Sequence, residues 1–271
     1  MDNNYQQEID KGLRFGFGRN WKDFLSTLDN EVIVKAAQDI KDWTGHQSFA
    51  GMRVIDIGSG SGIHSFAFHS LGADELLSFD YDNDSVEATK QMWEKAGRPQ
   101  NWNVTQGSVL DASFLNSLGT FDMVYSWGVL HHTGSMWEAI GNAASVLSHD
   151  GLMWIAIYQK GSSYASDLAL KQRYIRNSAF GKKIMEWKWI LRLMAKRLFN
   201  GKNPFTWNEK VERGMNVHND IIDWLGGLPY EVADKTEIEA FGKTKGLILV
   251  KTKELPEGGC SSYLFRKSTP I

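Results

Sequence analysis

The sequence predicts an α/β fold built on a mainly parallel sheet. From residue 51 to residue 158, short runs rich in β-branched and aromatic residues alternate with helical stretches. The first of these strands ends in a glycine-rich turn, VIDIGSGSG, which leads directly into a helix. Alternation of this kind implies right-handed crossovers and a sheet that helices cover on both faces.

The expected elements follow in chain order. Residues 20–46 carry apolar side chains at spacings of three to four and predict a helix. The expected strands are MRVIDIG, ELLSFDYD, NWNVTQGSV, FDMVYSW and LMWIAIY. The helices between them are HSFAFHSLGA, DSVEATKQMWEKAG, DASFLNSLG and SMWEAIGNAASVLSHDG, with Gly151 just past the end of the last. A final helix, DKTEIEAFGKTKG, and two strands, LILVKTKEL and CSSYLFRK, predict an added antiparallel edge.

An interruption of this alternation divides the chain into three parts. Residues 1–50 form an N-terminal helical part, and residues 51–159 together with 233–271 form the sheet core. Residues 160–232 are helical and irregular, so we interpret them as an insertion after the fifth strand.

Composition bounds the function classes. A chain of 271 residues, 42% of them hydrophobic, can bury one large core. The formal net charge of −2 gives no general basic field for nucleic acid. The single cysteine, Cys260, excludes an internal disulfide framework. Together with a polar N-terminus and no apolar run of about 18 residues, this predicts a cytoplasmic protein.

The glycine turn and an acid on the next strand suit a ligand that contains a ribose. Gly58, Gly60 and Gly62 allow tight backbone angles and close approach of a ligand. Asp80 ends the second strand and can accept hydrogen bonds from two ribose hydroxyls, unless it is an ordinary turn residue. The alternative is a nicotinamide or flavin domain, but the GxGxG spacing differs from the GxGxxG of those proteins.

These motifs resemble those of the class I S-adenosylmethionine-dependent methyltransferases. VIDIGSGSG is similar to their first motif, Asp80 to their ribose-binding acid, and FDMVYSWGVLHH to their fourth strand. The likeness spans about residues 51–158 and is nearest to the small-molecule type, including the ubiquinone- and menaquinone-biosynthesis methyltransferases. It implies a Rossmann-like seven-stranded sheet of order 3-2-1-4-5-7-6 with strand 7 antiparallel, and S-adenosyl-L-methionine as the cofactor.

The resemblance also implies a cofactor site. Its residues are Asp56, Gly58, Ser59, Gly60, Gly62, Asp80, Tyr81, Ser108, Val109, Ser126, Trp127, Phe17 and Trp21. The glycine turn would face the methionine part of the cofactor, Asp80 the ribose, and Tyr81 the adenine. Ser108 and Val109 would flank the adenine edge, and the backbone at Ser126 and Trp127 would lie by the amino group. The residues expected to close over the cofactor as an N-terminal lid are Phe15, Phe17, Asn20 and Trp21.

Two adjacent histidines follow the fourth strand, where the methyl group should lie. His131 or His132 could orient the acceptor or act as a general base, and we favour His132 slightly. Because neighbouring residues at a helix start point in different directions, we expect only one of them to face the acceptor. Two alternatives are hydrogen bonding to backbone and metal ligation, although no nearby set of Cys, His or carboxylate residues completes a metal site.

The insertion supplies candidates for the acceptor pocket. The substrate-binding residues that we expect are Tyr158, His218, Asp220, Asp223, Trp224 and Tyr230. In the alternative interpretation, residues 213–231 are a loop that caps the edge of the sheet. Asp220 and Asp223 would then form hydrogen bonds with the backbone.

A basic segment lies within the insertion. Residues 171–202 carry ten Lys or Arg residues against a single acid, Glu186. This segment could be a solvated helix face, a site for an anionic acceptor, or, through residues 181–199, a transient membrane-surface contact. Nucleic acid is the weakest interpretation because the basic character is confined to this one segment. The tryptophan-rich insertion could also support a homodimer.

The function that we expect is methyl transfer to a small-molecule acceptor, and a hydroxyl oxygen is the acceptor atom that we favour. The reaction would be an in-line displacement in which a histidine removes the acceptor proton. N- or C-methylation, a glycan or lipid-linked acceptor, and a catalytically silent cofactor-binding partner are the alternatives. The sequence SWGV stands where nucleic-acid base methyltransferases carry an N/D-P-P-Y/F motif, which disfavours that class.

Overall fold

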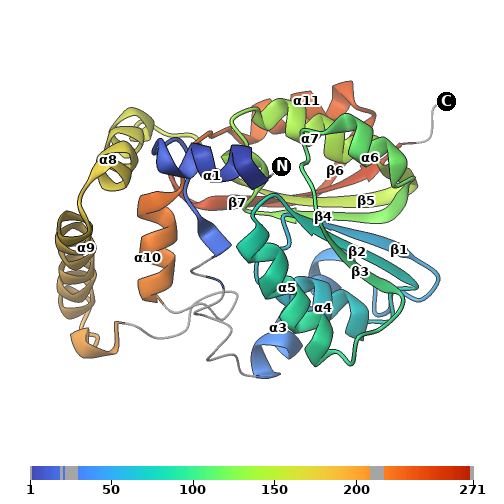
Figure 1. The fold of residues 1–271 in the computed structure, drawn as a ribbon, viewed down its shortest axis with the longest axis horizontal. Coiled ribbons are helices and arrows are strands. Elements are labelled where there is room, and N and C mark those ends of the chain that lie inside the picture. The colour runs from blue at the N-terminus through green and yellow to red at the C-terminus, as the bar shows by residue number, and fades with distance from the viewer. Residues whose placement is uncertain (1, 19–20, 22–29, 208–216, 269–271) are drawn as a thin grey trace.

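A single seven-stranded sheet organises the computed structural model, which describes residues 2–18, 21, 30–207 and 217–268 (Figure 1). The strand order is β3-β2-β1-β4-β5-β7-β6, and β7 runs antiparallel to both of its neighbours. The strands are β1 (Arg53–Ile57), β2 (Glu75–Asp80), β3 (Trp102–Gln106), β4 (Phe121–Trp127), β5 (Leu147–Tyr158), β6 (Leu247–Lys253) and β7 (Cys260–Lys267). The expected fold class and strand order are confirmed.

Helices cover both faces of the sheet, as Figure 1 shows. One face packs against α3 (Asn30–Thr44), α4 (Ile63–Ser70) and α5 (Asn83–Lys95). The other packs against α6 (Ala112–Ser117), α7 (Met136–Ser145) and α11 (Lys235–Thr244). Successive strand residues supply opposite cores, as Val54 and Ile55 do, because side chains alternate across a strand.

Aspartates fix the starts of three core helices. Asp82 accepts a hydrogen bond from Asp84 N at 3.0 Å at the start of α5. Asp111 caps α6 in the same manner, and Asp234 forms a reciprocal capping box with Glu237 at α11. Such caps satisfy backbone N–H groups that have no partner within the helix. The chain direction after β2 and β3 is therefore set by local side-chain chemistry.

The expected end of the helix before β5 is wrong. The helix α7 stops at Ser145, and the chain enters β5 already at Leu147. Leu147 is completely buried and pairs with Phe121 of β4. Burial and strand pairing therefore override the helical pattern of this stretch. Asp150 then adopts a φ of 58°, which lets β5 bend before its second half pairs with β4.

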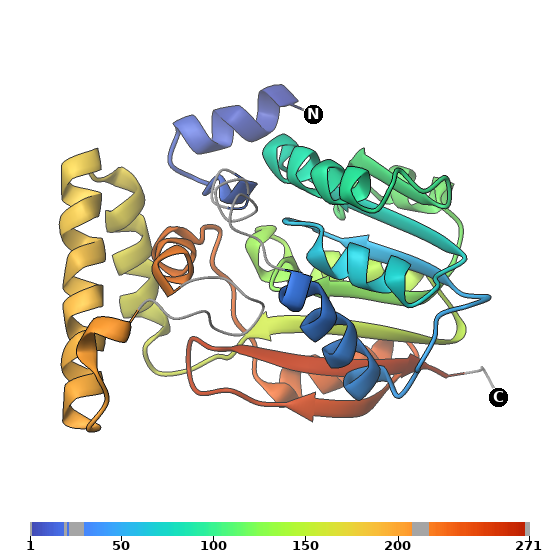
Figure 2. The same ribbon diagram turned by 90° about the horizontal axis from the view of Figure 1, so that it is seen from below.

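The first part of the N-terminal region and the insertion lie at the carboxyl ends of the parallel strands, whereas α3 packs on one face of the sheet. The described N-terminal helix is α1 (Asp2–Asp10), and α3 covers the second half of the helix expected over 20–46. The insertion contains α8 (Tyr164–Arg176), α9 (Ala179–Phe199), the 3₁₀ turn η2 (Pro204–Thr206) and α10 (Val217–Gly226). Figures 1 and 2 show α10 nearest the sheet and α9 farthest from it.

Among the described residues, none of the helices has both the length and the apolar character needed to cross a membrane.

The prediction from the fold concerns Gly62, which has a φ of 75° at the start of α4. A Cβ there would lie 2.8 Å from Thr89 Cα of α5. We expect Gly62→Ala to lower the free energy of unfolding by about 2–5 kcal/mol, through left-handed strain and overpacking. Denaturant unfolding measures the change.

Gly97→Ala is the matched control, because its φ is 87° and no atom lies within 4 Å of the added Cβ. It should cost only the strain of about 1–2 kcal/mol. Equal losses in the two variants would contradict the close packing of α4 on α5.

Candidate cofactor and acceptor site

A cavity of about 940 Å³ opens where the parallel strands end. The ends of β1, β2, β4 and β5 form its floor, while the N-terminal segment and α10 form its walls. In open α/β sheets, ligands bind at this edge. The volume is near the top of the range of about 300–1,000 Å³ for single ligands, which leaves room for two small molecules.

The glycine turn presents its backbone to this cavity. Gly58 and Gly60 have φ values of 74° and 53°, in the region that other residues rarely adopt. Gly58 N donates to the Phe79 carbonyl at 2.8 Å, and Ser59 Oγ bonds Thr89 Oγ1 at 2.8 Å. A Cβ on Gly58 would lie 2.4 Å from Val129, so only glycine lets the turn after β4 come this close.

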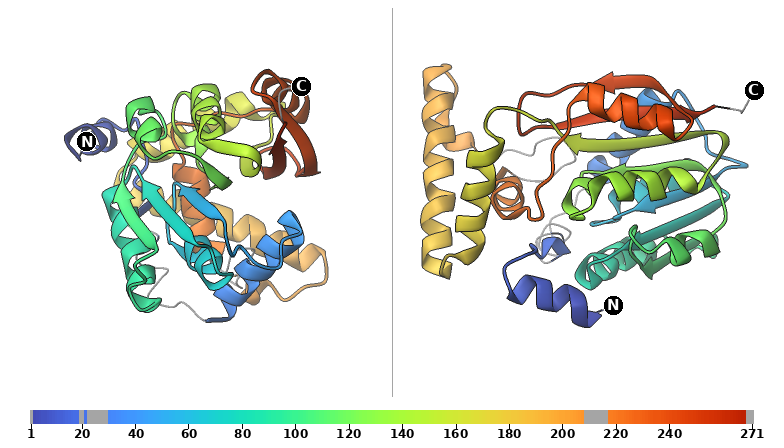
Figure 3. Two further views of the ribbon diagram at one scale, coloured as in Figure 1. Left: turned by 90° about the vertical axis from the view of Figure 1, so that its right-hand side faces the viewer. Right: turned by 90° about the horizontal axis from the view of Figure 1, so that it is seen from above.

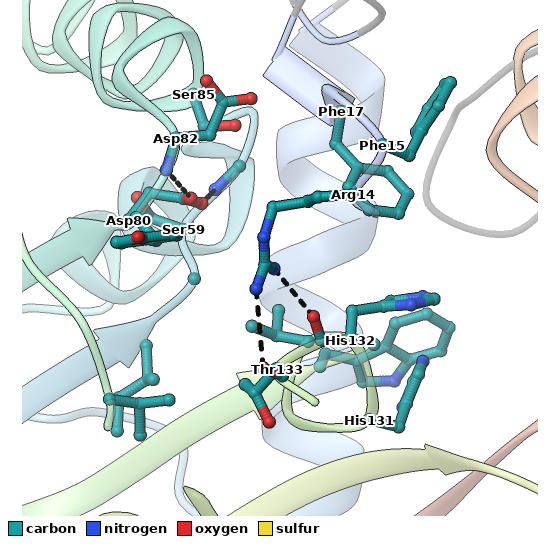
Figure 4. A pocket seen from close by; sticks show the side chains of 18 of the residues that line it. Arg14, Phe15, Phe17, Ser59, Asp80, Asp82, Ser85, His131, His132 and Thr133 are labelled. Atoms are coloured by element: carbon teal, nitrogen blue, oxygen red, sulfur yellow. Dashed lines mark hydrogen bonds between the residues drawn. The ribbon is translucent and has the colours of Figure 1, made fainter. Parts of the chain in front are cut away.

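Asp80 stands beside this turn at the end of β2. Its carboxylate accepts hydrogen bonds from Gly60 N at 3.0 Å and from Asp82 N at 2.9 Å (Figure 4). Burial raises the pKa of Asp80 to about 7, and the nearby Asp82 charge adds to this rise, while the two backbone N–H groups oppose it. The carboxylate therefore remains short of donors in the free protein.

Tyr81, Ser108 and Val109 line the same end of the cavity. Ser108 Oγ accepts a hydrogen bond from Leu110 N at 3.2 Å. Asp111 also lines the cavity and was not predicted, although its position before a helix marks it as a cap. Ser108, Val109 and Asp111 lie on the loop after β3, and Tyr81 directly follows the neighbouring strand β2.

Three of the expected cofactor residues lie beneath the cavity and do not line it. Asp56 is buried and accepts a hydrogen bond from Ser65 Oγ at 2.5 Å. Ser126 Oγ donates to the Ile57 carbonyl at 2.9 Å and so joins the ends of β4 and β1. Gly62 packs against α5. In the free protein, these three residues support the glycine turn on the side away from the cavity.

The N-terminal segment crosses the cavity, and Arg14 is its main anchor. The Arg14 guanidinium donates to the His132 carbonyl at 2.8 Å (Figure 4). It also pairs with Glu8 at 2.6 Å. It also lies 5.3 Å from the centre of the Tyr81 ring. Arg14, Glu8 and Tyr5 line the cavity but were not predicted, because their contacts lie far along the chain.

The same segment carries the expected lid residues. Phe17 packs 5.0 Å from the His132 ring, and the Phe15 ring fills the space beside Gly226 of α10. Gly18 N donates to Asp82 at 2.7 Å, which ties the segment to the end of β2. Trp21 lines the cavity next to Gly60. The expected lid residue Asn20 lies outside the described residues.

Both His131 and His132 line the cavity, and the expectation that only one of them faces the acceptor stays a prediction. His131 and His132 belong to a tight 3₁₀ turn, η1 (Leu130–His132), and their ring centres lie 4.3 Å apart. His132 Nδ1 lies 2.6 Å from the Pro229 carbonyl oxygen. A carbonyl only accepts, so Nδ1 donates and Nε2 keeps its lone pair. Figure 4 shows the two rings side by side.

His131 is completely buried and differs from His132 in its bonding. Within the part of the chain that the structure describes, neither of its ring nitrogens makes a hydrogen bond of ordinary geometry, although the Ala156 backbone lies close enough to raise its pKa. Its ring lies 4.1 Å from that of Tyr158. A buried imidazole must carry at least one N–H, and an unsatisfied donor is costly. A ligand in the cavity could supply the missing partner.

Both histidines are held in the neutral form. Burial lowers the pKa of His132 to about 3, against the opposing effect of the Pro229 carbonyl. Burial likewise places the pKa of His131 well below its usual range, and His132 and Lys171 lower it further. Among the described residues, no group of three or more metal-binding side chains accompanies them.

The expected acceptor residues divide into two groups. Tyr158, Asp220, Asp223 and Trp224 line the cavity. Tyr230 lies behind Tyr158, with ring centres 5.4 Å apart, and does not line it. His218 also lies outside the cavity, and its Nε2 is 3.5 Å from a Glu186 oxygen.

A buried lysine backs the acceptor end and was not predicted. Lys171 of α8 is completely buried, and its ammonium donates to the Trp224 carbonyl. The ammonium lies 4.4 Å from the Trp224 ring centre and 4.6 Å from that of Tyr230. Burial lowers the pKa of Lys171 to about 7, although Asp167 and Asp223 act in the opposite direction. Lys171 therefore lies behind the rings of Trp224 and Tyr230, and its pKa is close to neutral pH.

Comparison with known proteins identifies the family. Residues 48–213, more than half of the chain, match the protein family described as a methyltransferase domain. The chain belongs to this methyltransferase family. The assignment confirms the resemblance to the class I S-adenosylmethionine-dependent methyltransferases and the expected cofactor.

Curated relatives match over shorter stretches. Ribosomal protein L11 methyltransferase of Prochlorococcus marinus (strain AS9601) is 32% identical over 118 residues, 43% of this chain and 34% of that protein. The tRNA U34 carboxymethyltransferase of Geobacter sp. (strain M21) is 35% identical over 89 residues, 33% of this chain and 27% of that protein. The chain thus spans about a third or less of the length of these two curated relatives.

Solved structures show the same fold. An O-methyltransferase family protein from Burkholderia thailandensis gives a TM-score of 0.52 at 16% identity, over 89% of this chain and 59% of that one. Magnesium protoporphyrin IX methyltransferase from Synechocystis PCC 6803, with bound S-adenosylhomocysteine, also gives 0.52, at 14% identity over 88% of this chain and 83% of that one. At these identities, the likeness concerns the fold alone.

The Asp80 environment predicts a pH-dependent affinity for S-adenosylhomocysteine. Ribose hydroxyls would favour the ionised carboxylate, so the pKa of Asp80 falls on binding from about 7 and a proton is released. Affinity therefore rises with pH and levels off above 7, and we expect it to be about tenfold lower at pH 6 than at pH 8. Titration calorimetry in buffers of different ionisation enthalpy measures both quantities.

Asp80→Asn should lower the affinity at pH 8 by about 10- to 100-fold and abolish the dependence on pH. Asp74→Asn changes an exposed carboxylate and serves as the control. An unchanged pH dependence in Asp80→Asn would assign the released proton to another group.

Proposed function

We propose that this protein transfers the methyl group of S-adenosyl-L-methionine to a hydroxyl oxygen of a small-molecule acceptor. The observation that carries the proposal is a single cavity lined at one end by the glycine turn and Asp80, and at the other by two neutral histidines. The cofactor supplies a methyl group on a positively charged sulfur. The residues of the chain bind, orient and remove a proton.

The cavity fits this cofactor. The Asp80 carboxylate has spare lone pairs and a raised pKa, as expected of an acid that awaits two hydroxyl donors. The backbone from Gly58 to Gly60 would face the methionine part, Tyr81 the adenine ring, and the loop at Ser108 the adenine edge. Residues 1–50 would act as a lid.

His132 is the proposed base. Its Nδ1–H is fixed by the Pro229 carbonyl, which leaves the Nε2 lone pair as the only acceptor on the ring. An oriented base of this kind follows the general logic in which a third group sets the tautomer of a catalytic histidine. His131, whose ring nitrogens are both buried in the free protein, would hydrogen-bond the acceptor and hold its oxygen in line.

The low pKa of His132 also indicates the kind of hydroxyl. Burial and the Lys171 charge disfavour protonation of His132, so His132 is a weak base. A hydroxyl of high pKa would give up its proton to this base only with difficulty. An acidic hydroxyl, such as that of a phenol or an enol, gives up its proton more readily. We therefore propose an acceptor of that class.

The volume of the cavity, about 940 Å³, supports a small acceptor beside the cofactor. The insertion, residues 160–232, would act as a cap, with Tyr158, Asp223 and Trp224 bounding the acceptor pocket. His218 and Tyr230 would act from behind this wall. The Burkholderia neighbour is described as an O-methyltransferase family protein, in keeping with an oxygen acceptor.

The test is methyl transfer from isotopically labelled S-adenosyl-L-methionine to a panel of phenols, aliphatic alcohols, carboxylic acids and amines. With a phenolic acceptor, we expect His132→Ala to lower kcat by about 10²–10⁴-fold, because the base is lost. The affinity for S-adenosylhomocysteine should change little. His131→Ala should instead raise KM more than it lowers kcat, because it orients the acceptor.

His149→Ala is the matched control, since His149 is exposed on the bend of β5. Transfer to amines alone would contradict the oxygen acceptor. No transfer to any acceptor class would favour a silent cofactor-binding protein. Equal kcat in His132→Ala and the wild type would remove the base role.

The burial of His132 predicts a flat pH profile. The base works in its neutral form, and a pKa of about 3 keeps it neutral throughout the range in which the protein can be assayed. At saturating cofactor and acceptor, kcat should therefore vary little between pH 5.5 and 8. A histidine of ordinary pKa would lose about tenfold at pH 5.5. An inflection near pH 6.5 in kcat would contradict a buried base.

A further inference from the structure

The outer helix α9 carries a row of large apolar side chains that nothing in the described chain covers. They recur every three or four residues, a spacing that places them on one side of a helix. They are Phe180 (78% exposed), Ile184 (42%), Trp187 (56%), Leu191 (58%) and Leu198 (66%), and we name them the outer stripe. Contiguous exposed apolar side chains of this size usually mark an interaction site.

The outer stripe is not the face that holds α9 on the protein. Met185 and Ile190 are buried on the opposite side, and Met185 forms an apolar cluster with Tyr174 of α8 and Leu225 of α10. Glu186 on this inner side accepts a hydrogen bond from Tyr174 at 2.8 Å. Figures 1 to 3 show α9 at the end of the molecule farthest from the sheet. The helix thus has one packed and one unpacked apolar face.

Positive charges flank the outer stripe. Lys188 and Lys183 border it on opposite sides, and Arg192 and Lys196 continue from Lys188 at four-residue intervals, each about 40° further round the helix. The only acid in α9 is Glu186, which is buried. Within the described ranges, Lys188, Arg192 and Lys196 have no carboxylate partner. The exposed surface of this helix is therefore cationic as well as apolar.

This charge pattern decides between two kinds of partner. A second copy that stacked its outer stripe on this one would bring lysine and arginine rows together without exposed acids on α9 to neutralise them. An anionic lipid surface supplies the missing negative charge and also accepts apolar side chains. Helices that lie in a membrane interface combine an apolar face that carries Trp, Phe and Leu with Lys and Arg beside it.

The segment after the helix continues the pattern. Phe199 is 92% exposed at the end of α9, and Phe205 in η2 is 80% exposed. Lys202 lies between them. Both phenylalanines extend the apolar surface beyond the last turn of the helix, and Lys202 adds a further cation.

We infer that the outer stripe and its flanking cations dock this protein on an anionic lipid surface, with α9 lying in the plane of the interface. The side chains of the stripe enter the boundary between headgroups and acyl chains, and Lys188, Arg192 and Lys196 contact the headgroups. This inference does not depend on the methyl acceptor.

The experiment is co-sedimentation of the full-length protein with vesicles. One set contains phosphatidylcholine alone, and the other contains phosphatidylcholine and phosphatidylglycerol at about two to one. We expect binding to the mixed vesicles only, weakened at about 0.5 M salt, where charges are screened. Lys188→Ala, Arg192→Ala and Lys196→Ala together should weaken the partitioning on the order of 100-fold. Trp187→Ser with Leu191→Ser should weaken it independently of salt.

The control removes three exposed lysines elsewhere, Lys35→Ala, Lys95→Ala and Lys253→Ala, and should bind like the wild type. If this control variant lost as much vesicle binding, net charge alone would account for the binding and the inference would be overturned. Failure of the wild type to bind mixed vesicles would do the same. Light scattering after size exclusion completes the test. A dimer that Trp187→Ser with Leu191→Ser converts to a monomer would assign the stripe to a second copy.

Discussion

The arrangement of the site depends on two carboxylates that end β2. Asp80 and Asp82 hold three separate segments together, because their oxygens accept from Gly60 N of the glycine turn, Asp84 N of α5 and Gly18 N of the N-terminal segment. Two like charges this close repel, which contributes to the raised pKa of Asp80. Backbone N–H groups offset only part of that cost. This end of the cavity is therefore built for additional donors, and a ribose provides two.

The two ends of the cavity differ in their electrostatics. The β2 end is acidic, whereas the histidine end holds neutral rings in front of the buried Lys171. Arg14 connects the ends, since its guanidinium reaches both the Tyr81 ring and the His132 carbonyl. The Arg14 side chain thus contacts both the acidic end and the turn that carries the histidines. A lid closed by Arg14 would couple cofactor binding to the position of the base.

The sequence predicted the parts of the fold that local chemistry determines. Strand alternation, the glycine turn and the acid after β2 were all read from short patterns, and the strand order followed from the family resemblance. Contacts such as that of Arg14 with His132, 118 residues apart, carry no local signal. His218 lies outside the cavity while Asp220, Asp223 and Trp224 line it, because residues at i, i+3 and i+4 share a helix face that His218 does not. Helical spacing applied within 217–226 would have separated them.

In the helix α9, the spacing of apolar residues in the sequence does not show which face is buried. Its pattern contains two apolar faces, and a pattern alone cannot say which of them meets the protein. The structure places Met185 and Ile190 inside and leaves the outer stripe exposed. The inner face also carries Trp189, whose ring lies 4.7 Å from that of Trp224, a residue that lines the cavity. One aromatic pair therefore connects the wall of the cavity with the helix that carries the outer stripe.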